Sequence, residues 1–378
     1  MSRLHLLSSL AGTGALSVLV GCGDSLPDVA LLNTVRPLAA RVEVTQPLVP
    51  DDDPDAAPRA QALPFETVTI TPLLAGPQGI VDADTLAPLW FACPLSPTQS
   101  LYGCISSEFP ITMTDIPPCE SPVPIFDLDF SEIPEPQGLC QLGQSGTSSM
   151  TVPFDFNILS GGGIELTMIA GAEDGTSTET CAEVLLSGDI DVPDDCVLLL
   201  QRVTVGPLER LFALAESFGV TLPEEFGDVE LEDIPDFDRH PRITSVGVQP
   251  LDEDGNETSG VVTEIPDGGA LTATYGDRMR FNAVTPVTEL QTFTVESANG
   301  EIREETEAYL GAWYRTWGKL QSDSSNDPVS FNDFSLEEGS QDESPLPEDD
   351  TVEFIYVVRD GRSGVDWWSW SVEASAIP

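Results

Sequence analysis

An uncharged apolar stretch near the start of the chain determines the compartment in which the rest of it folds. The stretch runs from Leu6 to Val20 and follows Arg3. It is shorter than the roughly twenty residues that span a bilayer. A basic residue followed by such a stretch is typical of a secretory signal peptide. We therefore expect residues 1–21 to be a signal peptide and the mature chain to fold after export.

The stretch closes on a short cysteine-containing motif, Leu19, Val20, Gly21 and Cys22. The motif resembles the lipobox of bacterial lipoproteins, in which small residues precede a cysteine that takes lipid through a thioether and becomes the new N-terminus. The alternative is an ordinary signal peptide with a cysteine there by chance. The resemblance implies lipidation of Cys22 and stable attachment to a membrane, because several acyl chains act together. Gly23 rather than Asp follows, which favours an outer-membrane or cell-surface location, periplasmic or surface-facing.

The other cysteines form an even set, as expected of an exported chain that folds in an oxidising compartment. Six cysteines can pair in many ways, and we expect neighbours in sequence to pair. A metal site would need C-x-x-C pairs or nearby histidines, and the sequence has neither around these cysteines. The expected disulfides are Cys93–Cys104, Cys119–Cys140 and Cys181–Cys196.

The chain is strongly acidic, with 64 Asp and Glu against 15 Lys and Arg and a formal net charge of −49. Such a surface repels nucleic acid and anionic lipid headgroups, so we expect neither as a partner. The charge is compatible with calcium binding, with basic partners, or with solubility in a saline medium, which is the interpretation we favour.

Short stretches of alternating polar and apolar residues, separated by turn residues, predict an all-β fold of sandwich type. The residues from Pro94 to Thr147 lack this periodicity, and we expect a long loop region pinned by disulfides. The strands expected in the first half are Leu38–Val44, Glu66–Thr71, Leu89–Cys93, Met150–Phe156, Ile164–Ile169, Cys181–Leu186 and Cys196–Val205.

One helix and an acidic linker are expected before the second half. Pro207 suits a first helical turn and Gly219 an end. The second half then begins like the first, because His240–Pro250 mirrors Arg41–Pro47 as a strand closing on proline. This loose repeat extends to Arg278–Ala283 in place of Glu66–Thr71, and to the Trp313 region in place of Trp90. The apolar face of the helix comprises Leu208, Leu211, Phe212, Ala215 and Phe218.

The second half carries the pattern of an immunoglobulin-like sandwich. Tyr309–Leu320 is an expected strand with a central tryptophan, Trp313, of the kind that packs between two sheets. Residues 352–358 alternate, and the turn at 359–364 leads into 365–372 as a hairpin. Residues 323–350 are expected to form a solvated insertion. The predicted organisation is a signal peptide (1–21), a lipidated tether (22–37), a disulfide-stapled β-sandwich domain (38–206), one short helix with an acidic linker (207–238) and an immunoglobulin-like β-sandwich domain (239–378).

These features together are similar to a group of lipoproteins from myxobacteria and related bacteria that carry immunoglobulin-like or PKD-like modules. The resemblance rests on the lipobox, on Cys196–Val205, on Pro241–Val248 and on Val357–Gly364. It implies a cell-envelope β-sandwich protein. The group has no established activity, so no catalytic residue is carried over.

The candidate sites are few. Catalysis by histidine would need His240, since the one other histidine, His5, leaves with the signal peptide. Asp252, Asp254 and Asn256 alternate as calcium ligands do, although a polar hairpin turn explains them better and they do not fit an EF-hand loop. Trp367 is a candidate sugar-binding residue, whereas alternation places Trp368 and Trp370 in the core, and core packing is the favoured interpretation of these tryptophans.

The hypothesis that follows is a non-enzymatic lipoprotein of the cell envelope that acts as a structural or assembly partner of another envelope protein. The alternative is an extracellular binding module for polysaccharide or a surface receptor, with calcium as a possible ligand. Exposed aromatic residues clustered on one sheet face would favour sugar binding, and a large apolar patch would favour a protein partner.

Overall fold

The computed structural model describes residues 28–49, 55–97, 99, 106, 108–122, 133–172, 175–188, 193–217, 234–296, 302–325, 329–336 and 350–375. This part of the chain is mostly β-sheet, with several sheets and few helices, as an all-β sandwich requires. The expected signal peptide and Cys22 lie outside the described residues. No helix within these ranges combines the length and apolar character needed to cross a membrane.

Two sheets form the N-terminal half, and their facing sides bury one apolar core. Trp90, Ile70 and Leu166 are among its members, all at most 1% exposed. We name the sheets 1 and 2. In sheet 1, β3 (Thr67–Gly76) pairs with β1 (Arg36–Gln46), β4 (Gly79–Val81) and β7 (Ser148–Thr151). Sheet 2 has the order β2 (Gln61–Ala62), β9 (Cys196–Val205), β8 (Gly163–Gly171), β5 (Leu89–Leu95) and β6 (Cys140–Gln144).

The described residues contain more helix than the single one expected. The predicted helix is α5 (Leu208–Ser217), which buries Leu211, Phe212 and Ala215. The predicted strand Cys181–Leu186 is wrong, because these residues belong to α4 (Thr178–Ser187). The remaining helical segments are α1 (Ala83–Leu86), α3 (Phe156–Leu159) and the 3₁₀ turns η1 (Met113–Asp115) and η5 (Val287–Glu289).

Local sequence explains why α4 is a helix. Ser177 caps its first turn by accepting a hydrogen bond from the Thr180 N–H, and Gly188 ends it with a φ of 75°. The buried side chains fall at the spacing of one helical face: Thr178, Cys181, Ala182, Leu185 and Leu186.

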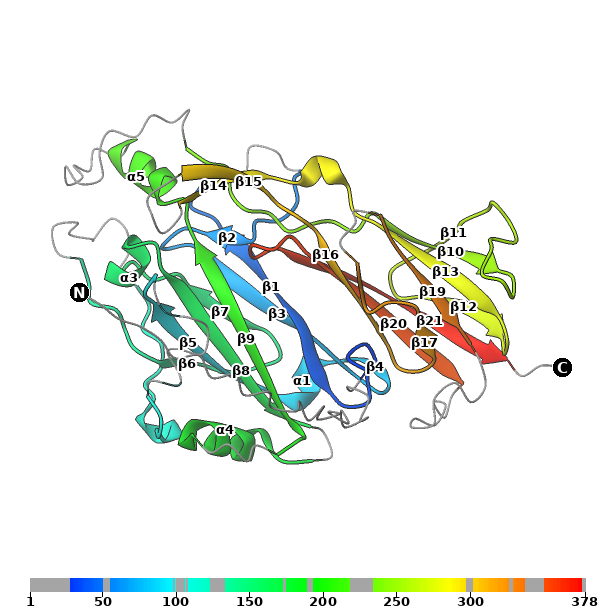
Figure 1. Ribbon diagram of the computed structural model, residues 1–378. Coiled ribbons are helices and arrows are strands. Elements are labelled where there is room, and N and C mark those ends of the chain that lie inside the picture. Colours follow the sequence, from blue (N-terminus) through cyan, green and yellow to red (C-terminus); the bar gives the residue numbers. More distant parts are fainter. Residues whose placement is uncertain are drawn as a thin grey trace, which may run out of the picture.

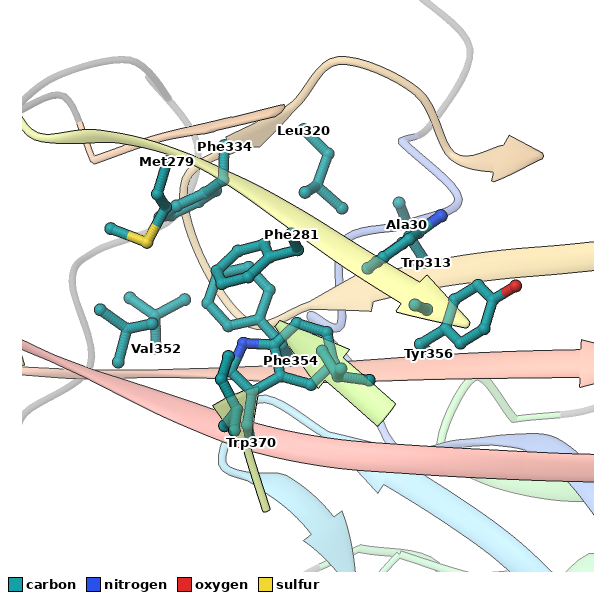
Figure 2. Close-up of a cluster of buried hydrophobic side chains, with 14 of the residues drawn as sticks. Ala30, Met279, Phe281, Trp313, Leu320, Phe334, Val352, Phe354, Tyr356 and Trp370 are labelled. Carbon is teal, nitrogen blue, oxygen red and sulfur yellow. The ribbon is translucent and has the colours of Figure 1, made fainter. Parts of the chain in front are cut away.

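Two further sheets form the C-terminal half around a core of aromatic rings (Figure 2). Phe354 and Trp370 are stacked with ring centroids 5.4 Å apart, and Phe281 lies 5.0 Å from each. Sheet 3 has the order β12 (Gly269–Thr274), β21 (Val365–Ser375), β20 (Thr351–Arg359), β16 (Leu310–Arg315) and β18 (Ser324–Ser325). Sheet 4 has the order β11 (Thr263–Ile265), β10 (Ser245–Leu251), β13 (Arg278–Val284), β19 (Val329–Ser335) and β17 (Lys319–Leu320).

A separate hairpin joins β14 (Thr292–Glu296) to β15 (Ile302–Thr306). The expectation of a solvated insertion at 323–350 is wrong in part, because β19 is an inner strand of sheet 4 between β13 and β17. Residues 337–349 lie outside the described ranges.

The strand pairing of the first half recurs in the second. The antiparallel pair β1–β3 corresponds to β10–β13, and the series β5–β8–β9 corresponds to β16–β20–β21. A short strand then pairs in parallel with the last strand of each series, β2 with β9 and β12 with β21. The sequence repeat is therefore also a repeat of topology, while the exact domain boundaries stay predictions.

The four sheets are stacked, with sheet 1 between sheet 2 and sheet 3 (Figure 1). One face of sheet 1 lines the N-terminal core. Its other face packs on sheet 3 through a cluster of Leu32, Leu38, Ala39, Leu73, Ala75, Ile355, Val357 and Val365. Strand β20 is consequently buried on both faces, with Phe354 and Tyr356 in the C-terminal core and Ile355 and Val357 between the halves.

Candidate functional site

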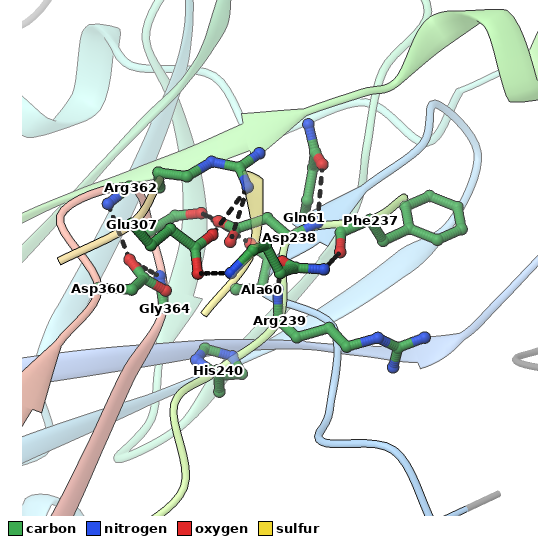
Figure 3. A network of polar contacts seen from close by, with 12 residues as sticks. Ala60, Gln61, Phe237, Asp238, Arg239, His240, Glu307, Asp360, Arg362 and Gly364 are labelled. Carbon is green, nitrogen blue, oxygen red and sulfur yellow. Dashed lines mark hydrogen bonds and ion pairs between the residues drawn. The ribbon is translucent and has the colours of Figure 1, made fainter. Parts of the chain in front are cut away.

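Three acidic side chains meet where the two halves join. Asp238 precedes β10, Glu307 follows β15, and Asp360 begins the turn between β20 and β21. One carboxylate oxygen from each residue lies within 4.8 Å of the other two. The three residues are 0%, 6% and 2% exposed, respectively. We call Asp238, Glu307 and Asp360 the junction triad (Figure 3).

The β20–β21 turn fixes Asp360. Its Oδ1 accepts hydrogen bonds from the backbone N–H groups of Arg362, at 2.7 Å, and Gly364, at 3.1 Å. A Cβ at position 364 would lie 1.9 Å from Asp360 Oδ2, so only glycine fits there. The turn therefore holds this carboxylate against the segment that carries Asp238.

Asp238 is fixed by contacts with the N-terminal half, and Glu307 by a contact within the C-terminal half. The backbone N–H of Asp238 donates to Gln61 Oε1 at 3.1 Å, and the backbone N–H of Ala60 donates to the Asp238 carbonyl at 2.9 Å. Glu307 Oε2 accepts from the Gln291 N–H at 2.9 Å. The site thus combines the linker, the loop after β15, the β20–β21 turn and, through Ala60 and Gln61, the N-terminal half.

One guanidinium partly balances the three carboxylates. Arg362 Nη1 lies 2.9 Å from Glu307 Oε1 and 3.4 Å from Asp238 Oδ1. Burial raises the pKa of Asp360 to about 7, and the charge on Asp238 acts in the same direction. Burial also raises the pKa of Glu307. Fully ionised, the triad with Arg362 would retain two negative charges, so it favours uptake of a proton or a cation.

Two oxygens of the triad accept no hydrogen bond, although one of them, Asp238 Oδ1, lies 3.4 Å from the Arg362 guanidinium. Asp238 Oδ1 and Asp360 Oδ2 are buried and accept no hydrogen bond from any described residue. Buried polar atoms nearly always have a partner. An all-oxygen, anionic set of this kind suits a hard cation such as calcium.

The calcium candidate from the sequence forms a tight exposed turn. Asp252 Oδ1 accepts from the backbone N–H groups of Asp254, at 3.0 Å, and Asn256, at 2.8 Å. Gly255 between them has a φ of 81°. These hydrogen bonds lower the pKa of Asp252. The geometry is that of an Asx-type turn, and calcium binding there stays a prediction.

Trp367 lies at the contact between sheets 1 and 3. The ring is half-buried, with the Arg41 guanidinium carbon 4.5 Å from its centroid. It lines a cavity of about 260 Å³ together with Pro72 and Ile80. Trp370 is 1% exposed in the C-terminal core, and Trp368 packs against the same core. Sugar binding by Trp367 stays a prediction.

His240 has a structural role. Its Nδ1 accepts from the backbone N–H of Val365 at 3.0 Å, which leaves Nε2 as the donor to the Val42 carbonyl at 2.9 Å. Burial lowers the pKa of its imidazole to about 4. The neutral ring therefore joins the segment before β10 to β21 and β1.

The structure contains the Cys119–Cys140 and Cys181–Cys196 disulfides, which confirms two of the three expected pairs. Cys93 is disulfide-bonded too, and its predicted partner Cys104 lies outside the described residues. The lipidation prediction at Cys22 likewise falls outside them.

The sequence interpretation missed the junction triad. The sequence pattern predicts an acidic linker at Asp238 and a turn at Asp360, with no functional site at either. The signal that could have drawn attention to Asp360 is the turn sequence Asp360-Gly-Arg-Ser-Gly364, in which an acid precedes two glycines and a base. No protein-family model, no curated protein and no solved structure matches the chain.

Proposed function

We propose that the chain is a non-enzymatic lipoprotein of the cell envelope. It is exported by its signal peptide, attached to the outer membrane through lipid on Cys22, and serves as a structural or assembly partner of another envelope protein. The observation that carries this proposal is the position of the segment that follows Cys22.

That segment is built into the C-terminal half. Arg315 N–H donates to the Ala30 carbonyl at 2.9 Å, and Leu32 N–H donates to the Arg315 carbonyl at 2.8 Å. The Arg315 guanidinium, 1% exposed, pairs with Asp28. Residues 28–37, expected within a tether, thus include buried positions at Ala30, Leu31 and Leu32.

The packed segment begins close to Cys22 in the sequence, so its position bears on how the lipid would anchor the protein. Asp28 lies six positions after Cys22, and six positions of fully extended chain span at most about 20 Å. Lipid on Cys22 would hold the Arg315 edge of the C-terminal half close to the bilayer. A fixed orientation of this kind suits a scaffold that presents one surface to a partner.

The fold supports the same role. The strand order of both halves supports an immunoglobulin-like sandwich in each. So does a buried tryptophan on the first strand of the series β5–β8–β9 and β16–β20–β21, Trp90 on β5 and Trp313 on β16. We infer two such modules in tandem. The apolar contact between sheets 1 and 3 would keep them from moving independently, because separating them would expose buried leucine, isoleucine and valine side chains.

The anchoring is tested by comparing the full chain with its Cys22→Ser variant in the native host. Metabolic labelling with an alkyne fatty acid should mark the wild type but not Cys22→Ser, and this variant should leave the membrane fraction. Gly23→Ala is the matched control and should remain labelled. Label on the Cys22→Ser variant would refute lipidation at this cysteine.

The assembly role is tested by mild crosslinking of intact cells, followed by purification of the lipidated protein and mass spectrometry. We expect one envelope protein in a reproducible, near-stoichiometric amount. Recovery of the lipoprotein alone would contradict the assembly role.

A further inference from the structure

We propose that the junction triad binds one calcium ion, and that this ion fastens the linker that carries Asp238 to the loop after β15 and to the β20–β21 turn. The inference goes beyond the envelope role proposed above and does not depend on lipidation. It rests on the spacing of the carboxylates, on the buried oxygens of Asp360 and Asp238 that accept no hydrogen bond, and on the uncompensated charge.

The spacing of the three oxygens suits a cation of this size. Because each oxygen lies within 4.8 Å of the other two, a point exists within about 2.8 Å of all three. Calcium–oxygen distances are about 2.3–2.6 Å, so a small inward movement of the side chains completes the contacts. Magnesium demands distances near 2.1 Å and regular octahedral geometry, and it would need a larger contraction.

The buried oxygens that accept no hydrogen bond are the second observation. Asp360 is 2% exposed and Asp238 is fully buried, yet Asp360 Oδ2 and Asp238 Oδ1 accept hydrogen bonds from none of the described residues. The hydrogen bonds that do reach these carboxylates use the other oxygen of each: Arg362 and Gly364 N–H on Asp360 Oδ1, and Ser363 Oγ on Asp238 Oδ2. The turn therefore orients both carboxylates. It leaves Asp360 Oδ2 without a hydrogen bond from any described residue, and it leaves Asp238 Oδ1 with only the 3.4 Å ion pair to Arg362.

The charge of the site favours a divalent ion over a second guanidinium or a lone proton. Arg362 already contacts Glu307 and Asp238 and neutralises one charge. A proton would neutralise a second charge and leave one carboxylate uncompensated in a buried position, which is costly. Calcium cancels both remaining charges. Zinc prefers sulfur and nitrogen ligands, which the triad lacks.

Calcium binding is tested with the full chain stripped of metal by a chelator at pH 7.5. Calcium chloride alone is then added to about 1 mM, within the range in which extracellular calcium modules bind. The readouts are the thermal midpoint of unfolding and the number of ions bound in equilibrium dialysis. The midpoint of the wild type should rise by a few degrees, and magnesium should raise it less.

The decisive variant is Asp360→Asn, which keeps an oxygen for the turn N–H groups. It should bind one ion fewer per chain than the wild type and lose most of the calcium-induced rise. Asp254→Ala, in the exposed turn, is the matched control and should behave like the wild type. Glu307→Gln is a second triad variant that should also bind one ion fewer. Near-UV circular dichroism of the buried tryptophans verifies that each variant is folded.

The proposal is overturned if folded Asp360→Asn binds as many ions as the wild type with the same rise in midpoint. It is also overturned if calcium leaves the wild-type midpoint unchanged, since a proton would then be the occupant of the triad. Loss of the rise in Asp254→Ala, with Asp360→Asn unaffected, would move the site to the turn and refute the proposal.

Discussion

Trp90 and Trp313 occupy equivalent positions in the two halves of the chain. Trp90 lies on β5, which pairs with β8, and Trp313 lies on β16, which pairs with the corresponding strand β20. Each tryptophan is 1% exposed. The indole N–H of Trp90 donates to the Ser145 carbonyl at 2.8 Å, and that of Trp313 donates to Ser330 Oγ at 3.0 Å. Both halves therefore bury a tryptophan at the same position of the sandwich, and the indole N–H has a different acceptor in each.

Replacing either tryptophan by phenylalanine should destabilise the fold. Trp90→Phe and Trp313→Phe each remove core volume and leave an acceptor without its donor, and should lower the free energy of unfolding by about 1–3 kcal/mol. Trp367→Phe, half-buried under Arg41, should cost less than about 1 kcal/mol. Urea denaturation measures all three. A Trp367→Phe cost equal to that of Trp313→Phe would contradict this ranking.

Asp360 makes stability depend on pH in a predictable direction. Burial raises the pKa of Asp360 from its ordinary value of 3.8 to about 7 in the fold. Between these values the folded chain holds a proton that the unfolded chain has released, so stability falls as pH rises and levels off above about pH 7. The groups facing it are Asp238, Glu307 and Arg362.

Asp360→Asn should therefore gain stability over the wild type as pH rises. We expect a difference that grows by about 1 kcal/mol per pH unit between pH 5 and 7 and then stays constant. The measurement is urea unfolding of both proteins in chelator. The two proteins must be compared with each other, because His240 also makes stability depend on pH. Its pKa is lowered to about 4, so stability rises with pH between about 4 and 6.5 in both proteins, and this contribution cancels in the difference. A pH-independent difference would show that Asp360 does not titrate in this window.

The buried pair of Arg59 and Glu66 should be strongly coupled. Their side chains are 2% and 0% exposed, and Arg59 Nη2 lies 2.8 Å from Glu66 Oε1. Arg59→Met leaves the carboxylate buried without its cation and should cost about 3–5 kcal/mol. A double-mutant cycle with Glu66→Gln should give a coupling of about 2 kcal/mol or more. The exposed pair Arg303–Glu305 is the control, with an expected coupling below about 0.5 kcal/mol. Equal couplings would mean that burial does not strengthen the pair.

Sequence periodicity predicted strands best where the residues that face the core alternate with the residues of the opposite face. Val352, Phe354, Tyr356 and Val358 alternate, and all four lie in the C-terminal core as expected. The apolar Ile355 and Val357 between them also indicate burial of the opposite face, which a period-two interpretation overlooks. The stacking of sheet 1 on sheet 3 could not be predicted, because it depends on which sheets meet.

The errors arose where side chains depart from the usual division between polar and apolar faces. In β19, Ser330 and Asn332 are buried, whereas Phe331 is 53% exposed and lies under Arg280. Because the buried residues are polar, the sequence of this strand predicts a solvated segment. The junction triad joins residues from 238 to 360. In a chain with 64 acidic residues, no local feature distinguishes these three. Their burial comes from the meeting of the two halves.

The docking of the N-terminal segment is open to a direct test. Asp28 pairs with the buried Arg315 guanidinium and also accepts from the Ala30 N–H at 3.0 Å. Asp28→Asn removes the charge and weakens the contact, so the Leu32–Arg315 backbone hydrogen bond should open more often. Hydrogen exchange at the Leu32 amide should accelerate about tenfold, which corresponds to roughly 1.4 kcal/mol of local stability.

Val29→Ala is the matched control, because Val29 is 61% exposed and one residue away. Its exchange at Leu32 should equal that of the wild type, while amides in the middle of β8 should exchange alike in all three proteins. The Arg315 guanidinium keeps its hydrogen bond to the Gly318 carbonyl in Asp28→Asn, so the β16 strand itself should stay protected. Unchanged exchange at Leu32 in Asp28→Asn would mean that burial of Ala30 and Leu32 alone holds the segment, and that the ion pair contributes little to fixing the chain beside Cys22.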